Sequence, residues 1–215
     1  MSYLGSLVSN PHEGVAFPAA GKAEDVVIVK GVYDYFHYKC DGFNDVGWGC
    51  GYRTLQTMCS WILRLHKNLD AQNSVPSIPS IQQILVDIED KPAEFMGSRD
   101  WIGSFEVGYV LSTHYNIDFK ILHVTASNDW KSIVHQLSKH FREGGCPVMM
   151  GGKTDAASKC IIGTCKNTHL LVLDPHLTGR ASGNRKLVSW HPIEDFDVKG
   201  SNFYNLCIPL IKWES

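Results

Sequence analysis

Long apolar runs and a strong excess of charge of either sign are both absent from this sequence of 215 residues. No apolar run approaches the roughly 20 residues that a membrane helix needs. The stretch 1–20 also lacks the apolar core flanked by positive charge that marks a signal peptide. The formal net charge of -2 provides no basic footprint for nucleic acid or an anionic membrane surface. We therefore expect a soluble, cytoplasmic protein with no nucleic-acid or membrane partner.

The seven cysteines also lack the pattern of a disulfide framework, because they are odd in number and follow no repeated spacing. The nearest pair, Cys160 and Cys165, matches no common zinc spacing. We expect reduced thiols, most of them small buried hydrophobic residues. We expect neither a metal ion nor an organic cofactor.

Repeats and low-complexity blocks are absent as well. With 44% hydrophobic and 20% charged residues, the composition argues against disorder. The length suits one compact domain over residues 1–215, with 1–25 as a loose N-terminal segment.

Hydrophobic periodicity and cap residues predict the elements. Helices are expected over 50–67, 80–88, 104–114 and 128–142, and strands over 26–29, 119–124, 147–150, 169–173, 186–190 and 204–210. A capping box of Ser80 and Gln83 opens the second helix, Asn128 caps the fourth, and Gly144 and Gly145 close it. The aromatic segment 32–38 is also β-prone. Lys153, Lys159 and Lys166 are assigned to solvated loop. Because the helices precede most strands, we predict an α+β fold with a helix packed on a mainly antiparallel sheet.

Cys50 stands at the predicted start of the first helix, directly after Gly47, Trp48 and Gly49. A helix N-terminus lowers the pKa of a thiol, and its free N–H groups can bind a developing oxyanion. The glycines permit a sharp turn and a close approach of substrate. This context predicts a nucleophile; the alternative is a buried cysteine after an ordinary tight turn. Cys59 lies on the apolar stripe of the same helix and is predicted to be core.

A histidine base is suggested by Asp174-Pro175-His176, which ends the apolar strand 169–173. Residues two apart in an extended segment point to the same side, and Pro175 favours an extended Asp174. A carboxylate beside an imidazole orients the ring and stabilises imidazolium. The alternative is an Asp-Pro turn followed by an exposed histidine.

Four blocks of sequence carry a family resemblance. They are Tyr-Phe-His-Tyr at 35–38, Asn-Asp-Val-Gly-Trp-Gly-Cys-Gly-Tyr-Arg-Thr-Leu-Gln-Thr at 44–57, Trp-Ile-Gly-Ser at 101–104 and Leu-Asp-Pro-His-Leu-Thr-Gly at 173–179. In this order they resemble the ubiquitin-fold modifier 1-specific cysteine proteases, in the short form of that family. The block at 44–57 is highly specific, whereas Asp-Pro-His alone would be weak. Leu177 departs from the family, where a tyrosine is expected after the histidine.

The resemblance implies a papain-like cysteine protease fold and cleavage after the C-terminal glycine of ubiquitin-fold modifier 1. This cleavage matures the precursor of the modifier and removes it from conjugated proteins. The resemblance assigns Cys50 as nucleophile, His176 as base, Asp174 as its orienting group and Tyr38 as a donor of the oxyanion hole. Trp48 and Trp101 are candidates for the walls of a narrow substrate channel, although either could be core.

Three other functions stay open. The autophagin proteases share a Gly-Trp-Gly-Cys turn and an Asp-Pro-His but cleave another ubiquitin-like modifier. A related deubiquitinase branch is disfavoured, because no zinc-finger or ubiquitin-binding segment precedes the domain. The chain could also be a catalytically inactive module that binds a ubiquitin-like tail. The joint presence of Cys50, Tyr38, Asp174 and His176 argues against this last alternative.

Overall fold

The computed structural model describes residues 7–18, 21–65, 74–126, 130–153, 157–179, 187–196 and 198–213, and its centre is one antiparallel sheet. The sheet has seven strands in the order β2-β7-β3-β4-β5-β6, with β1 paired to β4. Their bounds are β1 Val26–Ile28, β2 Phe119–Val124, β3 Val148–Gly152, β4 Lys159–Cys165, β5 His169–Leu173, β6 Val188–Pro192 and β7 Tyr204–Pro209. Every pairing is antiparallel, as predicted.

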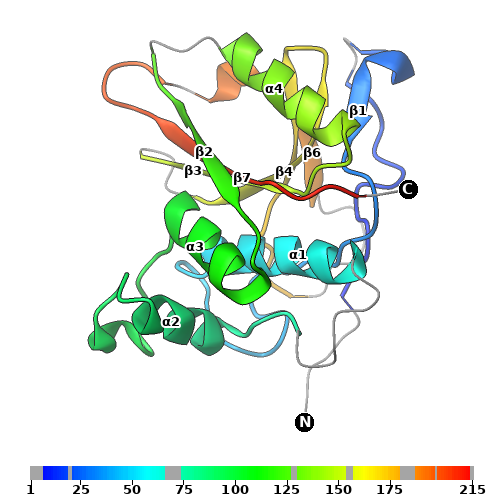
Figure 1. Ribbon diagram of the computed structural model, residues 1–215. Helices are drawn as coiled ribbons and strands as arrows, with labels where there is room; N and C mark the ends of the chain where they lie inside the picture. Colours follow the sequence, from blue (N-terminus) through cyan, green and yellow to red (C-terminus); the bar gives the residue numbers. More distant parts are fainter. Residues whose placement is uncertain are drawn as a thin grey trace.

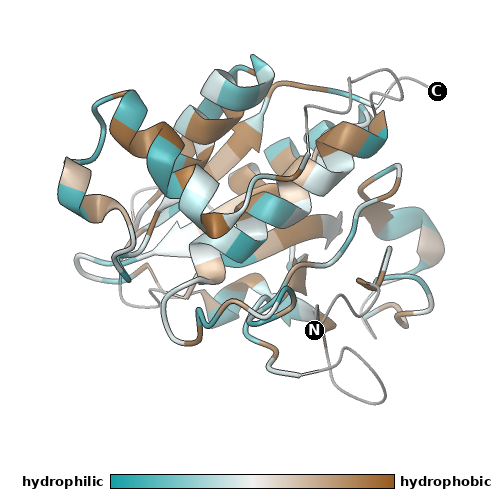
Figure 2. Ribbon diagram, turned by 90° about the horizontal axis from the view of Figure 1, so that it is seen from below, coloured by the Kyte–Doolittle hydropathy of each residue, from teal (hydrophilic) through white to brown (hydrophobic). Residues whose placement is uncertain are grey.

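Helices cover both faces of this sheet (Figure 1). They are α1 Cys50–Leu65, α2 Ile78–Asp87, α3 Ser104–Tyr115 and α4 Trp130–Arg142, with short 3-10 turns η1 Ala23–Asp25, η2 Ala93–Phe95 and η3 Ile193–Asp195. Helix α4 lies on one face, α1 and α3 lie on the other, and α2 packs outside α3. Hydrophobic and hydrophilic residues alternate along the helices (Figure 2), which fits elements with one side toward the core. The predicted α+β fold is confirmed.

Helix α1 begins at Cys50 as predicted and is the most enclosed helix. Its residues from Cys50 through Ile62 are all buried. The sheet and α3 cover one side, and the irregular segment 33–48 covers the other with buried tyrosines. The predicted continuation to residue 67 lies outside the described residues. Because α1 is held on all sides, its first residue has a fixed place relative to the sheet.

The prediction that segment 32–38 favours β-structure was wrong. It forms only an isolated bridge, between Ser9 and Asp34, and otherwise packs irregularly on α1. Backbone hydrogen bonds from Tyr35 N–H to Val8 C=O (2.8 Å) and from Asn10 N–H to Tyr33 C=O (3.0 Å) bind it to the N-terminal segment. The aromatic residues in this segment are therefore core residues in a loop.

The start of α2 differs from the prediction, and the predicted cap of α4 cannot be compared with the structure. Helix α2 begins at Ile78, and Ser77 rather than Ser80 is its cap, because the Ser77 hydroxyl accepts from the Ser80 N–H at 3.2 Å. Pro79 is compatible with this earlier start, since the first turn of a helix needs no N–H there. The predicted cap Asn128 lies outside the described residues. Helix α4 ends as predicted, with Gly144 at a positive φ of 81°.

Strand β4 was missed, and its position matters for the site. Its first half pairs with β3 and its second half with β1, while β5 runs along its other edge. Lys159 thus begins a central strand instead of lying in a solvated loop. None of the helices in the described part of the chain has the length and apolar character needed to cross a membrane.

Candidate active site

Cys50 is the first residue of α1 and is 6% exposed. The turn before it is built on the carbonyl of Asp45, which accepts from the N–H groups of Trp48 (3.2 Å) and Gly49 (2.8 Å). Gly47 within this turn has a φ of 86°, a conformation that favours glycine. The turn places the thiol of Cys50 where α1 meets the sheet. This is the N-terminal end of α1, whose first backbone N–H groups have no partner within the helix.

His176 and Asp174 follow the last residue of β5 and contact each other directly. The Oδ1 atom of Asp174 lies 2.5 Å from Nδ1 of His176 and also accepts from the His176 backbone N–H at 2.9 Å. The extended segment predicted side chains that point to the same side, and in the structure they are in direct contact. The carboxylate therefore holds the imidazole by its Nδ1, and this leaves the other ring nitrogen for the thiol.

Four segments meet at the thiol. The side chains of His176 and Tyr38 and the backbone N–H of Ser158 lie close enough to the Cys50 thiol that each of them lowers its pKa. The rings of Tyr38 and His176 meet edge to face with centroids 5.3 Å apart. Ser158 immediately precedes β4, so sequence analysis, which missed that strand, had no signal for it.

The pKa values of the thiol and the imidazole shift toward an ion pair. Burial would raise the pKa of Cys50, but the hydrogen bond and charge of His176, the Ser158 N–H and the Tyr38 hydroxyl together lower it. The pKa of His176 is raised to about 9, first by its hydrogen bond to Asp174 and then by that to Cys50. Opposite charges in contact each favour the charged form of the other.

The remaining two groups keep the protonation state that a peptidase needs. Burial opposes ionisation of Asp174, yet its pKa is lowered because His176 donates to it and Lys159 adds positive charge nearby. Burial and the neighbouring Cys50 raise the pKa of Tyr38, so its hydroxyl stays protonated and available as a donor. Lys159 contributes here because it begins β4, opposite the end of β5.

Hydrogen bonds join the aromatic segment 32–38 to the Asp-Pro-His segment 174–176. The Tyr38 N–H donates to the Pro175 carbonyl at 3.1 Å, and the Tyr35 hydroxyl donates to the Asp174 carbonyl. Nδ1 of buried His37 lies 2.9 Å from the carbonyl of Tyr38 and 3.3 Å from that of Leu177. Burial lowers the pKa of His37, which keeps it neutral. The family resemblance had given Tyr38 a role as an oxyanion donor, whereas no sequence signal indicated that Tyr35 and His37 hold the Asp-Pro-His segment in place.

The two tryptophans lie in different surroundings. Trp48 is 7% exposed and packs edge to face against Phe43 and Tyr52. Trp101 is 57% exposed and borders an open surface cavity of about 310 Å³. The Tyr52 hydroxyl donates to the Asp100 carbonyl at 2.9 Å, which fixes the chain next to Trp101 against the first turn of α1. Trp48 is thus part of the core, and Trp101 is available at the surface.

Within the described residues, no group of three or more histidine, cysteine, aspartate or glutamate side chains is arranged to hold a metal ion. The chemistry that this site can perform with its own groups is attack by a thiolate on an acyl carbon. The thiol, the ring and the hydroxyl donor supply the nucleophile, the proton carrier and the oxyanion donor of such a reaction.

Comparisons with known proteins agree with this chemistry. The profile of Peptidase family C78 matches residues 24–207. Probable Ufm1-specific protease 1 of Drosophila melanogaster is 41% identical over 97% of this chain and 89% of its own, and Ufm1-specific protease 1 of Mus musculus is 38% identical over 94% and 93%. The crystal structure of UfSP from C. elegans superposes with a TM-score of 0.76 at 30% identity, over 97% of this chain and 38% of that one.

Proposed function

The chain belongs to peptidase family C78 and is a cysteine peptidase, and on this premise we propose that it cleaves after the C-terminal glycine of ubiquitin-fold modifier 1. In this proposal it matures the precursor of the modifier and releases the modifier from conjugated proteins. The substrate is suggested by the names of the relatives, two of which this chain covers over most of their length. The observation that carries the chemistry is the convergence of His176, Tyr38 and the Ser158 N–H on the thiol of Cys50.

We assign Cys50 as nucleophile, His176 as base and then acid, Asp174 as the group that orients His176, and Tyr38 as an oxyanion donor. The thiolate attacks the carbonyl carbon of the terminal glycine, and the π electrons move to the carbonyl oxygen. The Tyr38 hydroxyl and the Cys50 N–H donate to that oxyanion. When the C–N bond breaks, His176 gives its proton to the leaving amine.

The second half of the cycle releases the modifier. His176, now neutral, removes a proton from water, and the hydroxide attacks the thioester carbon. The thiolate leaves, and the imidazolium beside it restores the starting ion pair. Of the two candidate walls of the channel for the glycine tail, we keep Trp101, whose exposed ring a substrate can touch directly, whereas Trp48 packs in the core.

We further propose that residues 1–215 make one peptidase domain that works in the cytoplasm. A single domain is supported by the one continuous sheet to which all seven strands belong. A reducing compartment is supported by the seven cysteines, none of which is in a disulfide.

The test uses modifier probes that carry an electrophile in place of the C-terminal carboxylate. We expect the probe of ubiquitin-fold modifier 1 to label the protein, Cys50→Ser to abolish the label and Cys40→Ser to retain it. Cys40 is the matched control because it is the one cysteine of the seven that is not buried, and serine keeps an acceptor for the Arg53 side chain that lies 3.4 Å from its Sγ. Labelling by a ubiquitin or autophagy-modifier probe alone would overturn the substrate, and labelling by none would favour a binding module.

A further inference from the structure

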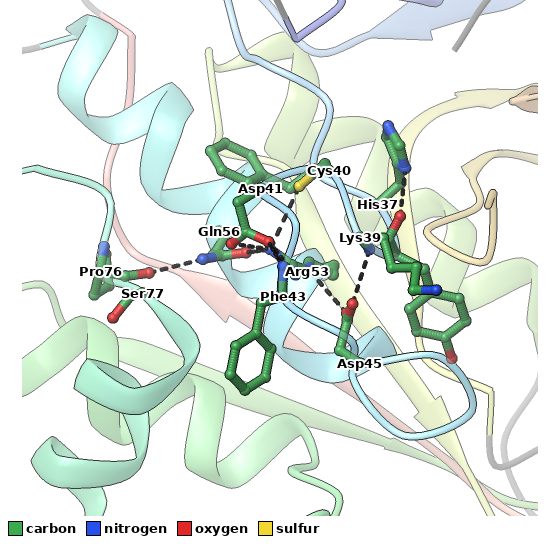
Figure 3. A network of polar contacts seen from close by, with 12 residues as sticks. His37, Lys39, Cys40, Asp41, Phe43, Asp45, Arg53, Gln56, Pro76 and Ser77 are labelled. Carbon is green, nitrogen blue, oxygen red and sulfur yellow. Dashed lines mark hydrogen bonds and ion pairs between the residues drawn. The ribbon is translucent and has the colours of Figure 1, made fainter. Parts of the chain in front are cut away.

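An arginine with a fully buried side chain lies one helical turn after Cys50, and the proposed chemistry does not use it. Arg53 donates through Nε to Asp45 at 2.8 Å and through both terminal nitrogens to the carboxylate of Asp41 at 2.8 Å (Figure 3). It also donates to the side-chain oxygen of Gln56 at 2.9 Å. The side chains of Arg53 and Asp45 are both 0% exposed, whereas that of Asp41 is 34% exposed.

Stability alone is a poor reason for such a cluster. Removing two charges from water costs free energy, and replacing a buried ion pair with apolar residues is often neutral or stabilising. Arg53 also donates to Sγ of Cys40 at 3.4 Å, so its planar fork serves four side chains at once, which an ammonium could not reproduce. A buried pair of this kind calls for a role in fixing a particular geometry.

Asp45 shows which geometry is fixed, because each of its oxygens has a separate partner. Its Oδ2 accepts from Arg53, its Oδ1 accepts from the Lys39 backbone N–H at 2.8 Å, and its carbonyl accepts from Gly49 at 2.8 Å. A Cβ added to Gly49 would lie 2.3 Å from Oδ2 of Asp45, so the turn closes directly on this carboxylate.

Two of the residues that donate hydrogen bonds to Asp45, Lys39 and Gly49, are chain neighbours of the two oxyanion donors. Lys39 directly follows Tyr38, and Gly49 directly precedes Cys50. Lys39 has a φ of 59°, a left-handed conformation that a side chain rarely adopts and that surrounding contacts must hold. Its N–H bond to Asp45 is such a contact, and Arg53 anchors that carboxylate to α1.

We propose that Asp45 and Arg53 are positioning residues of the oxyanion hole, which together set the Tyr38 hydroxyl and the Cys50 N–H at the spacing that one carbonyl oxygen requires. This inference rests on the proposed thiol chemistry of Cys50 but not on the identity of the modifier. It separates two functions within the site: the Asp45–Arg53 pair fixes the oxyanion donors, while Asp174 and His176 ionise the thiol.

The experiment compares two reactions of the Cys50 thiolate, of which only one needs an oxyanion hole. Acylation by p-nitrophenyl acetate passes through a tetrahedral oxyanion, whereas alkylation by iodoacetamide is a direct displacement at carbon. Both are measured from pH 5 to 10 in the full chain, with its fold checked by circular dichroism. Asp45→Asn is nearly isosteric but must turn an amide N–H toward either the Lys39 N–H or the Arg53 Nε–H.

We expect Asp45→Asn to slow acylation by about 10-fold or more, in line with the loss of an oxyanion donor, and to change alkylation by less than about 2-fold. Tyr38→Phe should slow acylation to a similar extent at pH values where Cys50 is fully ionised, where alkylation stays unchanged. It should also move the alkylation profile to higher pH, because the Tyr38 hydroxyl lowers the pKa of Cys50. Combining the two should slow acylation little further, because both act on one set of donors. Arg64→Gln is the matched control: it breaks an exposed ion pair of α1 with Asp34 and should alter neither reaction.

Equal losses of acylation and alkylation in Asp45→Asn would overturn the proposal, as would unchanged acylation or fully multiplicative effects with Tyr38→Phe. If Asp45→Asn does not fold, Asp41→Asn at the part-exposed end of the cluster replaces it, with the same selective but smaller loss expected. If the wild type reacts with both reagents yet ignores ubiquitin-fold modifier 1, the substrate assignment fails and the positioning proposal is still decided.

Discussion

Substituting Asp174 by asparagine tests how the thiolate–imidazolium pair is held. The pKa of His176 is raised from 6.5 to about 9, and the hydrogen bond that His176 donates to Asp174 is the largest cause. A shift of that size corresponds to about 3 kcal/mol in favour of imidazolium. Cys50 supplies part of it, and the Asp174 side chain is 49% exposed, so water screens its charge. We therefore attribute about 1 to 2 kcal/mol to Asp174, roughly one pH unit.

The sign of the expected change follows from which state each step needs. Acylation needs a Cys50 thiolate and a protonated His176, so kcat/KM rises as pH passes the lowered pKa of Cys50 and falls as it passes about 9. In Asp174→Asn the imidazolium is less stable. The alkaline limb should move down by roughly one unit, and the thiolate should form only at higher pH.

Iodoacetamide alkylation between pH 4 and 10 measures the thiolate, and kcat/KM over the same range measures the imidazolium. Asp195→Asn is the matched control, because Asp195 contacts His191 at 3.2 Å in a similar but exposed pair away from the site. The reasoning is refuted if Asp174→Asn lowers the rate while both limbs stay where they are in the wild type. Asp174 would then act on something other than the proton affinity of His176.

Two further predictions concern stability. Gly49→Ala should lower the free energy of unfolding by about 1 to 3 kcal/mol, because its Cβ would lie 2.3 Å from the Asp45 carboxylate; Gly151→Ala, whose nearest neighbour is 3.7 Å away, should stay within about 0.5 kcal/mol in the same thermal unfolding assay. His176 contributes to the pH dependence of stability with the opposite sign, so the second measurement is made in a His176→Ala background. In that background the free energy of unfolding, measured with urea, should be lower at pH 5.5 than at pH 7.5. Burial lowers the pKa of three histidines, so the unfolded chain binds more protons below about 6.5, and pH-independent stability would contradict this. These histidines are His12, His37 and His140.

The parts of the fold that sequence analysis could predict are those whose signals are local. The glycine turn predicts where helix α1 starts, and the spacing of apolar residues predicts its length. Strand β5 is predicted by a short apolar run that ends just before Asp174. Strand β4 escaped because it is buried on both faces and so lacks alternation, and because Gly163 interrupts it. A glycine is needed where β1 pairs with β4, since a Cβ at residue 163 would lie 2.8 Å from the Val27 carbonyl.

The candidate site divides in the same way. The pairing of Asp174 with His176 follows from two positions in an extended segment, and the position of Cys50 follows from its helix start. The contribution of Ser158 could not be predicted, because it depends on a strand with no periodic signal. The Asp45–Arg53 pair also had no local signal, since a charged residue on a helix is normally solvated, and only the packing of segment 33–48 over α1 buries it.

The site is therefore assembled from two layers whose alignment depends on a few bonds between distant parts of the chain. Tyr38 and Cys50 lie on the helical side, whereas Ser158 directly precedes β4 and His176 follows the end of β5. The bonds between the layers join residues that are far apart in sequence, as with His37 and Leu177, which are 140 residues apart. Closing a loop of that length costs conformational entropy, and folds rich in contacts of this kind fold more slowly than folds with local contacts. Because the thiol is activated only where both layers meet, a chain with a folded α1 but an incomplete sheet carries an ordinary, weakly reactive cysteine.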